Sequence, residues 1–275
     1  MTDIERAGEA ERFSILRLSR ESKDGIEKMV ARERPFTIIL NDNELVTLLS
    51  SPVELKYLAV GFLYSEGLIQ SRDDIKKVTV DDQRGVARVE TVNPTEIEEG
   101  VVFKRIISSG CGRGASFYSA ADTVIEKVDS SMELSVDEVF ILVAQFQRRS
   151  ELYAATGAVH SAALCDHKDI LIFSEDIGRH NAIDKIFGRC LLDNIPAKNR
   201  IIVTSGRITS EIMHKVAKRG IPVLISVSAP TDLAVKTADV LGITLVASVR
   251  GKKMDIYTGN ERIVTDGTSG QRAVG

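Results

Sequence analysis

The sequence is poor in three features that mark particular classes of protein: cysteine, long apolar runs and net charge. Among 275 residues it has only three cysteines, no run of about 18 apolar residues, and a formal net charge of just −3. Without such a run, no transmembrane helix of ordinary length is expected. The near balance of charge predicts no nucleic acid partner and no membrane-surface partner. The charged N-terminal stretch has no apolar core, so we expect no signal peptide and a location in the reducing cytoplasm.

The cysteines are odd in number and widely spaced, and they include no CxxC pair. This pattern argues against a disulfide framework or a zinc ribbon. Cys165 and Cys190 lie in apolar segments and are expected to be inert core residues. Cys111 lies between two glycines, with Arg105 and Arg113 close in sequence. Positive neighbours lower a thiol pKa and favour the nucleophilic thiolate, so Cys111 is the candidate for chemistry.

A mass of 30.1 kDa fits one large domain or two small ones. The residue composition and the pattern of apolar residues change along the chain, which divides it into five predicted parts. We predict a disordered tail over 1–13, a strand-rich α+β domain over 14–107, a cysteine loop and connector over 108–128, an α/β domain over 129–263, and a disordered tail over 264–275.

Local signals place the elements of these parts. Residues 41–43 mark a hairpin turn between two apolar runs. Ser51-Pro52 predicts a helix start, and the helix is expected to end near Gly67. Ser135 and Glu138 form a capping-box pattern. From there, apolar strands alternate with helices, which predicts a mostly parallel sheet covered on both faces.

Three strand-to-helix junctions of the α/β part carry hydroxyl groups or arginines, at 175–181, 205–207 and 228–232. Ligands in such folds bind beyond the carboxyl ends of the strands, where helix N-termini also point. Backbone N–H groups and arginine suit a phosphate or another planar anion. Ordinary helix capping by Asp176 or Thr231 is the alternative reading.

Two other groups of polar residues each allow more than one interpretation. The segment 250–253 is either a solvated turn or an extension of the anion site. His180 and Asp184 are four residues apart on one helix, which suits a metal pair, an acid–base pair or a local hydrogen bond. His160, taken alone, is expected to be a structural or surface residue.

Taken together, the motifs resemble those of the formate dehydrogenase accessory protein family, of the FdhD/NarQ type. The resemblance covers most of residues 36–263. The matching stretches are GFLYSEGLI (61–69), SSGCGRG (108–114), TGAVHSAAL (156–164), SEDIGRHNAIDKIFG (174–188), the long run from TSGR to SVRG (204–251) and IYTGNERI (256–263).

The resemblance implies a sulfurtransferase that takes sulfur from a cysteine desulfurase as a persulfide. The sulfur goes to the molybdenum cofactor, in its bis(molybdopterin guanine dinucleotide) form, for formate dehydrogenase. The implied fold is a cytidine-deaminase-like three-layer α/β domain with a smaller strand-rich α+β N-terminal domain, usually a homodimer. A guanine nucleotide would serve as a mimic of the cofactor.

Carried onto this chain, the resemblance makes Cys111 the persulfide carrier. It assigns cofactor binding to the segment Ser248, Val249, Arg250, Gly251, Lys252 and Lys253. Five further residues lie in matching motifs, and their cofactor-binding roles are our inference: Arg179, His180, Ser205, Arg207 and Thr231.

One departure from the family bears on mechanism. Many members have a second loop cysteine where this chain has Gly114, so a relay through one cysteine is the available route. A chaperone that presents the cofactor without moving sulfur is the alternative. Zinc-dependent deamination is disfavoured, because His160 is followed by Ser161-Ala162 instead of x-Glu and no PCxxC ligand pair exists.

Overall fold

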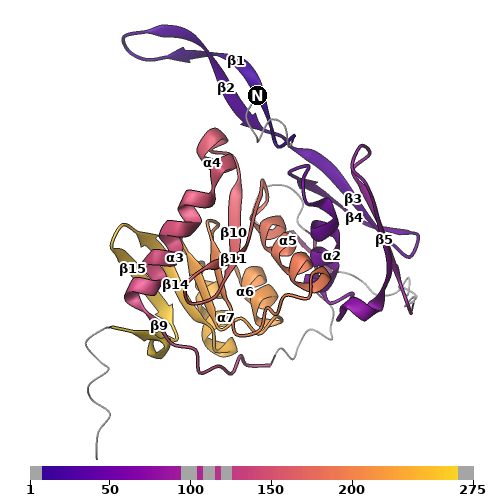
Figure 1. Ribbon diagram of the computed structural model, residues 1–275, viewed down its shortest axis with the longest axis vertical. Helices are drawn as coiled ribbons and strands as arrows, with labels where there is room; N and C mark the ends of the chain where they lie inside the picture. The colour runs from indigo at the N-terminus through magenta and orange to yellow at the C-terminus, as the bar shows by residue number, and fades with distance from the viewer. Residues whose placement is uncertain (1–7, 94–103, 108–114, 119–125, 266–275) are drawn as a thin grey trace, which may run out of the picture.

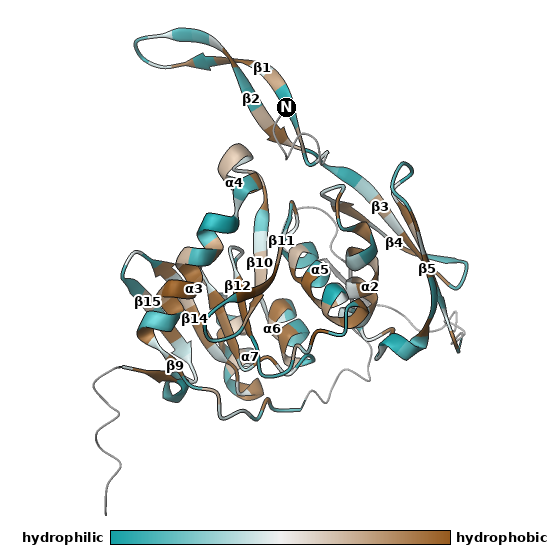
Figure 2. Ribbon diagram, viewed as in Figure 1, coloured by the Kyte–Doolittle hydropathy of each residue, from teal (hydrophilic) through white to brown (hydrophobic). Residues whose placement is uncertain are grey.

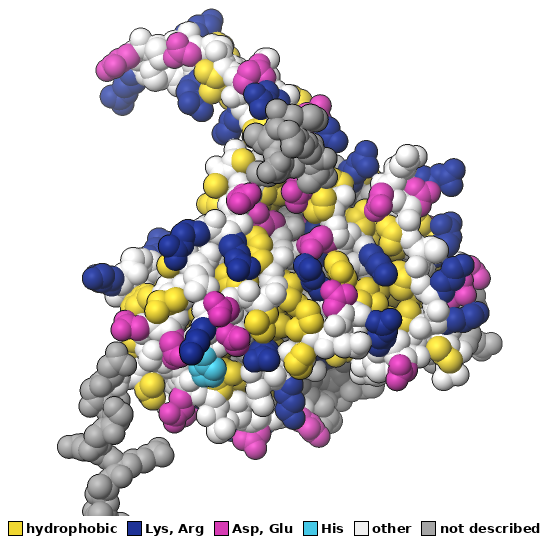
Figure 3. All heavy atoms as spheres, in the orientation of Figure 1, with side chains coloured by type: hydrophobic (Ala, Val, Ile, Leu, Met, Phe, Trp, Pro, Cys, Tyr) yellow, Lys and Arg dark blue, Asp and Glu magenta, His cyan; other side chains and the backbone are white. Residues whose placement is uncertain are grey.

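In a computed structural model, the chain consists of a projecting hairpin, a small sheet and a larger sheet with helices on both faces (Figure 1). The structure describes residues 8–93, 104–107, 115–118 and 126–265. Within these ranges, no helix is both long and apolar enough to cross a membrane. Basic and acidic side chains are interspersed over the face shown in Figure 3.

The hairpin pairs β1 (Ala10–Leu18) with β2 (Lys23–Ala31) in antiparallel register and extends away from the body (Figure 1). At its base, Ala10 packs against Leu152 and Val159. The predicted tail over 1–13 is therefore wrong for residues 10–13. These residues form a strand because β2 supplies their hydrogen-bond partners and the body buries Ala10.

The small sheet has the order β4-β3-β6-β5. The strands are β3 (Arg34–Leu40), β4 (Asn43–Ser50), β5 (Ile75–Asp81) and β6 (Val86–Thr91), with the short 3-10 helix η1 (Arg72–Asp74) before β5. The predicted hairpin turn is confirmed, since Asn41 and Asp42 both have positive φ, as a tight hairpin turn requires. Helix α2 (Leu55–Glu66) packs its apolar residues on this sheet.

The start of α2 differs from the prediction, although its end at Gly67 is confirmed. The helix begins at Leu55 and not at Ser51-Pro52. Glu54 precedes it with φ 57°, and its carboxylate accepts a hydrogen bond from the Ser174 hydroxyl. A contact distant in sequence therefore overrides the local preference for proline in the first turn.

The larger sheet has the order β11-β10-β12-β13-β14-β15. Its strands are β10 (His160–Cys165), β11 (Ile170–Asp176), β12 (Ile201–Thr204), β13 (Val223–Ser226), β14 (Thr244–Arg250) and β15 (Lys253–Thr258). Only the β12–β13 and β13–β14 pairs are parallel, so the expectation of a mostly parallel sheet is wrong. Short connections between β10 and β11 and between β14 and β15 reverse the chain, and a tight reversal forces antiparallel pairing.

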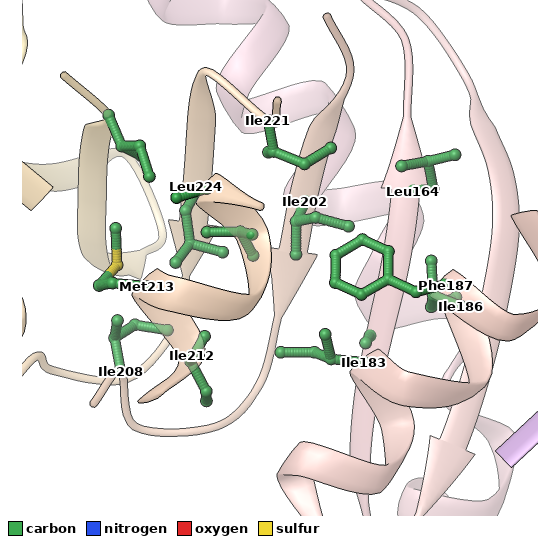
Figure 4. Close-up of a cluster of buried hydrophobic side chains, with 14 of the residues drawn as sticks. Leu164, Ile183, Ile186, Phe187, Ile202, Ile208, Ile212, Met213, Ile221 and Leu224 are labelled. Carbon is green, nitrogen blue, oxygen red and sulfur yellow. The ribbon is translucent and has the colours of Figure 1, made fainter. Parts of the chain in front are cut away.

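Helices cover both faces of this sheet, as predicted. One face carries α5 (Arg179–Leu192), α6 (Ser210–Ala217) and α7 (Asp232–Leu241), and the other carries α3 (Val136–Arg149), which continues into α4 (Glu151–Thr156). Figure 4 shows Phe187 of α5 and Ile212 of α6 packed with Ile202 and Leu224 of the sheet. In Figure 2, these helices carry both hydrophobic and hydrophilic stretches along their ribbons.

Short elements complete the chain. Strand β9 (Leu134–Ser135) pairs in parallel with β16 (Ile263–Val264), which follows the 3-10 helix η3 (Asn260–Arg262). The predicted C-terminal tail therefore starts too early, because Val264 still pairs with Ser135. The Ser135–Glu138 capping box is confirmed. Strands β7 (Lys104–Ile107) and β8 (Ala115–Tyr118) pair with each other in antiparallel register.

Helices α2 and α5 cross with their backbones in contact. A Cβ atom added at Gly61 would lie 1.7 Å from the Asp184 carbonyl oxygen, and one added at Gly188 would lie 1.9 Å from the Tyr57 carbonyl oxygen. Only glycine permits this approach at either position. The crossing joins the small sheet to the larger one.

We expect Gly61→Ala to lower the free energy of unfolding by about 3 kcal/mol, because the added methyl meets backbone atoms that cannot rotate away. Urea unfolding of the purified protein measures this loss. Gly25→Ala is the matched control, since a Cβ there meets nothing within 4 Å. Equal stability of the two variants would show that the helices separate freely.

Candidate functional site

Polar residues from five strands meet at one edge of the larger sheet. Strand β12 ends at Thr204, and the antiparallel β10 begins beside it, so His160 lies near Ser205. Across β10–β11, His160 pairs with Asp176, after which α5 begins. Strands β13 and β14 run parallel to β12 and end at the same edge. All three predicted junctions and the segment 248–253 therefore share this edge.

Hydrogen bonds fix the loops at this edge to one another. The Ser226 hydroxyl donates to the Gly206 carbonyl oxygen at 2.9 Å, and the Ser228 N–H donates to the Ser226 hydroxyl at 3.0 Å. The Ser248 N–H in turn donates to the Ser228 carbonyl oxygen at 3.0 Å. These bonds tie the ends of β12, β13 and β14 together, so side chains on the three loops have a fixed spacing.

Around Ser205 the site contains a histidine and two arginines. The Ser205 Oγ accepts a hydrogen bond from the Ser161 N–H at 2.9 Å and lies 3.4 Å from His160 Nδ1. Arg179, only 8% exposed, packs against Gly206, where an added Cβ would lie 2.8 Å from the Arg179 Cβ. Burial, and then the charges of Arg179 and Arg207, lower the pKa of His160.

His180 is a neutral group at this site. Burial is the main cause that lowers its pKa to about 3, followed by the charges of Lys215, Arg179 and His160. Its Nε2 lies 3.5 Å from the Glu211 carboxylate on α6. Asp184 instead binds Lys215, with Nζ–O distances of 2.7 and 2.8 Å.

The two residues therefore both face α6, but each has a different partner there. Among the described residues, no three His, Cys, Asp or Glu side chains gather as metal ligands would. The structure thus pairs His180 with Glu211 and Asp184 with Lys215.

A buried carboxylate anchors the start of α5. Asp176 accepts hydrogen bonds from the Gly178 N–H at 2.8 Å, the Asn181 side-chain amide at 2.9 Å and the Ser51 N–H at 3.1 Å. It also pairs with Lys185 at 2.7 Å, and both side chains are fully buried. Asp176 therefore fixes the helix N-terminus that carries Arg179 and His180, and it ties Ser51, which directly follows β4 of the small sheet, to that point.

Similarity to known proteins identifies the family. A model of the FdhD/NarQ family matches residues 31–264 of this chain.

The chain belongs to the FdhD/NarQ family.

Two curated relatives are proteins named sulfur carrier protein FdhD. The one from Bacillus pumilus is 45% identical over 239 residues, which cover 85% of this chain and 90% of the relative. The one from Bacillus subtilis is 41% identical over 239 residues, covering 86% and 91%. The crystal structure of a formate dehydrogenase accessory protein from Desulfotalea psychrophila superposes with a TM-score of 0.79 at 26% identity, covering 93% of this chain and 100% of that one. The resemblance inferred from the motifs is confirmed.

In this FdhD/NarQ chain, the segment 248–253 forms the turn between β14 and β15, with Gly251 at φ 59°. Arg250, Lys252 and Lys253 are exposed at the edge that carries the site. Our prediction that the side chain of Val249 binds the cofactor is wrong. Its side chain is 1% exposed and packs in the core beneath α3, because side chains alternate along a strand, so it does not face a ligand.

Two more predicted residues have structural roles in the FdhD/NarQ chain. Thr231 caps α7, since its hydroxyl accepts a hydrogen bond from the Ala234 N–H at 3.2 Å. Ser248 has φ 55°, a conformation that non-glycine residues seldom adopt, and it lies where the β14–β15 register shifts. This bend directs the following turn.

The prediction that Cys165 and Cys190 are inert core residues of this FdhD/NarQ chain is confirmed. Cys165 and Cys190 are both buried, and burial raises the pKa of each thiol to about 12. Neither is a thiolate at neutral pH. Cys111 lies outside the described residues, as does Arg113. Strands β7 and β8 flank that segment, with Ile107 opposite Ala115.

Two site residues of the FdhD/NarQ chain were missed from the sequence. His160 was expected to be structural, and Lys185 was not singled out. A mostly parallel sheet would have put the start of β10 at the far edge, so the position of His160 depends on the antiparallel order. Lys185 could have been found from the sequence, because it is a charged residue within an apolar helix segment. A lysine buried in such a place needs a carboxylate partner.

The neutral state of His180 predicts a pH dependence of stability. Its pKa is about 3 when folded and about 6.5 when unfolded, so the unfolded state binds more protons between these values. Stability conferred at neutral pH is therefore lost as the pH falls below about 6.5. We expect the free energy of unfolding to fall by about 2 kcal/mol more between pH 7 and 5 in the wild type than in His180→Gln.

Urea unfolding at the two pH values measures the difference. His167→Gln is the control, because its side chain is 45% exposed, and it should keep the wild-type dependence. A pH dependence unchanged in His180→Gln would show that the pKa of His180 is the same in the folded and unfolded states.

Proposed function

We propose that this protein is a sulfur carrier that accepts sulfur from a cysteine desulfurase. It passes the sulfur to the molybdenum cofactor used by formate dehydrogenase. The observation that carries the proposal is the 45% identity, over 85% of the chain, with a protein named sulfur carrier protein FdhD. The chemistry of the thiols supports it, because burial leaves Cys165 and Cys190 unreactive and Cys111 as the remaining cysteine.

The proposed loading step is an exchange at sulfur. The Cys111 thiolate attacks the outer sulfur of the desulfurase persulfide. A new S–S bond forms on Cys111, the S–S bond of the donor breaks, and the donor cysteine leaves as a thiolate. Cys111 then holds a persulfide. Delivery of its outer sulfur as sulfide takes up two electrons. A thiol reductant outside this chain supplies them: two of its thiols are oxidised to a disulfide, the S–S bond on Cys111 breaks, and Cys111 returns to a thiol.

The polar edge of the larger sheet suits the acceptor. Bis(molybdopterin guanine dinucleotide) carries pyrophosphate groups, and Arg179 and Arg207 provide guanidinium groups that pair well with phosphate oxygens. Ser205 adds a hydroxyl, and neutral His180 is a hydrogen-bonding group. The exposed cations Arg250, Lys252 and Lys253 extend the positive edge. In this proposal these residues hold the cofactor, with Ser248 and Gly251 shaping the turn and Thr231 holding the start of α7.

A sulfur carrier of this kind needs a donor and a recipient of sulfur. Its partners are a cysteine desulfurase and formate dehydrogenase, and it acts as a homodimer. A carrier that depends on a free thiol needs a reducing compartment, so we place it in the cytoplasm. The six-stranded sheet with helices on both faces supports a cytidine-deaminase-like description of the larger domain.

Gly114 favours a second candidate, in which the protein presents the cofactor as a chaperone without carrying sulfur. A relay that needs two loop thiols is unavailable with glycine at this position. The two candidates make opposite predictions for Cys111.

We expect Cys111→Ala to fold normally and to lose activation of formate dehydrogenase by at least tenfold. A persulfide has no other thiol on which to form, because the remaining two cysteines are buried. Enzyme activity in cells that express the variant measures the loss. Mass spectrometry after incubation with a desulfurase and cysteine should show a gain of about 32 Da, one sulfur atom, on wild-type Cys111.

Cys190→Ala is the matched control, and it should keep both the mass gain and the activation. Full activation by Cys111→Ala would establish the chaperone in place of the carrier.

The cofactor site predicts stabilisation by guanine nucleotides. GDP at ten times its Kd should stabilise the fold by about 1.4 kcal/mol, which raises the Tm by about 3 °C. Arg207→Gln removes an exposed guanidinium from the site, so the Tm without nucleotide should hold and the shift should disappear. Differential scanning calorimetry measures both.

Arg20→Gln, at the tip of the projecting hairpin, removes the same charge far from the site and should keep the shift. An equal shift in both variants would place the nucleotide elsewhere.

A further inference from the structure

His160 occupies the point where the groups of the candidate site converge. It lies at the start of β10 and pairs with Asp176 of β11. Its Nδ1 lies 3.4 Å from the Ser205 hydroxyl, which already accepts the Ser161 N–H at 2.9 Å. The hydroxyl hydrogen of Ser205 is therefore available to Nδ1 when that nitrogen carries no proton. This contact leaves Nε2 as the hydrogen-bond donor of the neutral ring.

The charges that face His160 come from three elements. Arg179 of α5 and Arg207 after β12 both oppose a proton on the ring, and Asp176 of β11 favours one. The imidazole of His180 on α5 also interacts with it electrostatically.

The influence of Asp176 is weakened by its own partners. Its carboxylate binds Lys185 at 2.7 Å and also accepts three N–H groups. Positive charge thus prevails around His160, and together with burial it keeps the ring neutral.

An anion at this point would reverse that balance. A phosphate held by the two guanidinium groups cancels the repulsion they exert on an imidazolium. A protonated His160 would then add a third cation to the anion, with Ser205 accepting its Nδ1–H. Because binding and protonation favour each other, each must strengthen the other by the same factor.

We propose that His160 contacts the pyrophosphate of the bound ligand and takes up a proton as the ligand binds. The inference rests on the proposed function, in which this edge holds a guanine dinucleotide. It adds a ligand-contacting residue and couples ligand affinity to pH. Release of the ligand would return the proton to solvent.

The test uses GDP-mannose, because its pyrophosphate diester stays fully ionised between pH 5 and 8 and does not titrate itself. NMR of the imidazole signals of the full chain gives the pKa of His160 with and without the nucleotide, at matched ionic strength. We expect the pKa to rise by about one unit on binding. By linkage, the Kd should be lower at pH 5 than at pH 8, by a factor that approaches about ten at most.

Two variants separate the role of His160 from a general effect of pH. His160→Gln should bind GDP-mannose with a Kd that is nearly independent of pH, while His167→Gln should keep the wild-type dependence. The NMR measurement on the wild type needs no variant, so it stands even if His160→Gln is unstable.

Binding without a change in the His160 pKa, or a wild-type pH dependence of the Kd that persists in His160→Gln, would overturn this inference and leave the cofactor site intact. If wild-type protein binds no GDP-mannose at any pH, the cofactor site and the inference both fail.

Discussion

The backbones of α2 and α5 touch at Gly61 and Gly188, and the arrangement of the two sheets depends on that contact. It brings polar groups of α5 into the region between the sheets, where water is excluded. There Lys185 meets Asp176, and Lys215 lies between Asp184 and Glu66 at 2.7 and 3.3 Å. Breaking one partner of such a buried pair is costly, so the pairs specify how the sheets are joined.

The candidate site follows from this junction. Asp176 receives the Ser51 N–H from the small sheet and the N–H groups at the start of α5. Contacts from the small sheet and from α5 itself thus fix the start of the helix that carries Arg179 and His180. On the other side, hydrogen bonds from Ser226, Ser228 and Ser248 fix the loops of the larger sheet. The cations therefore stand on a preorganised frame, which lowers the entropic cost of binding an anion.

Local patterns in the sequence predicted much of this fold. The capping box at Ser135, the helix end at Gly67 and the apolar strands of the larger sheet all follow from spacing and residue type. The direction of β10 did not follow, because nearest-neighbour pairing in a sheet depends on contacts far apart in sequence. The prediction of the start of α2 was wrong for the same reason, since Ser174, distant in sequence, binds Glu54 just before the helix.

Motifs located most of the candidate site because helix N-termini and strand ends carry their own signals. They could not show which side chains point inward. Val249 belongs to a matching motif yet packs in the core, because the bend at Ser248 and the alternation of β14 decide its direction. His160 carried no local signal, and only the tertiary order of the strands puts it beside two arginines.

The junction of α2 with α5 also bears on how the chain is made. The ribosome releases the small sheet and α2 long before the residues of α5 emerge. Until then, the face of α2 around Gly61 has no partner, and neither does the Ser51 N–H that Asp176 later accepts. The small sheet and α2 are therefore complete in sequence before all their contacts can form. The exposed helix must be protected from other chains while about 120 further residues are synthesised, at roughly 5–20 residues per second.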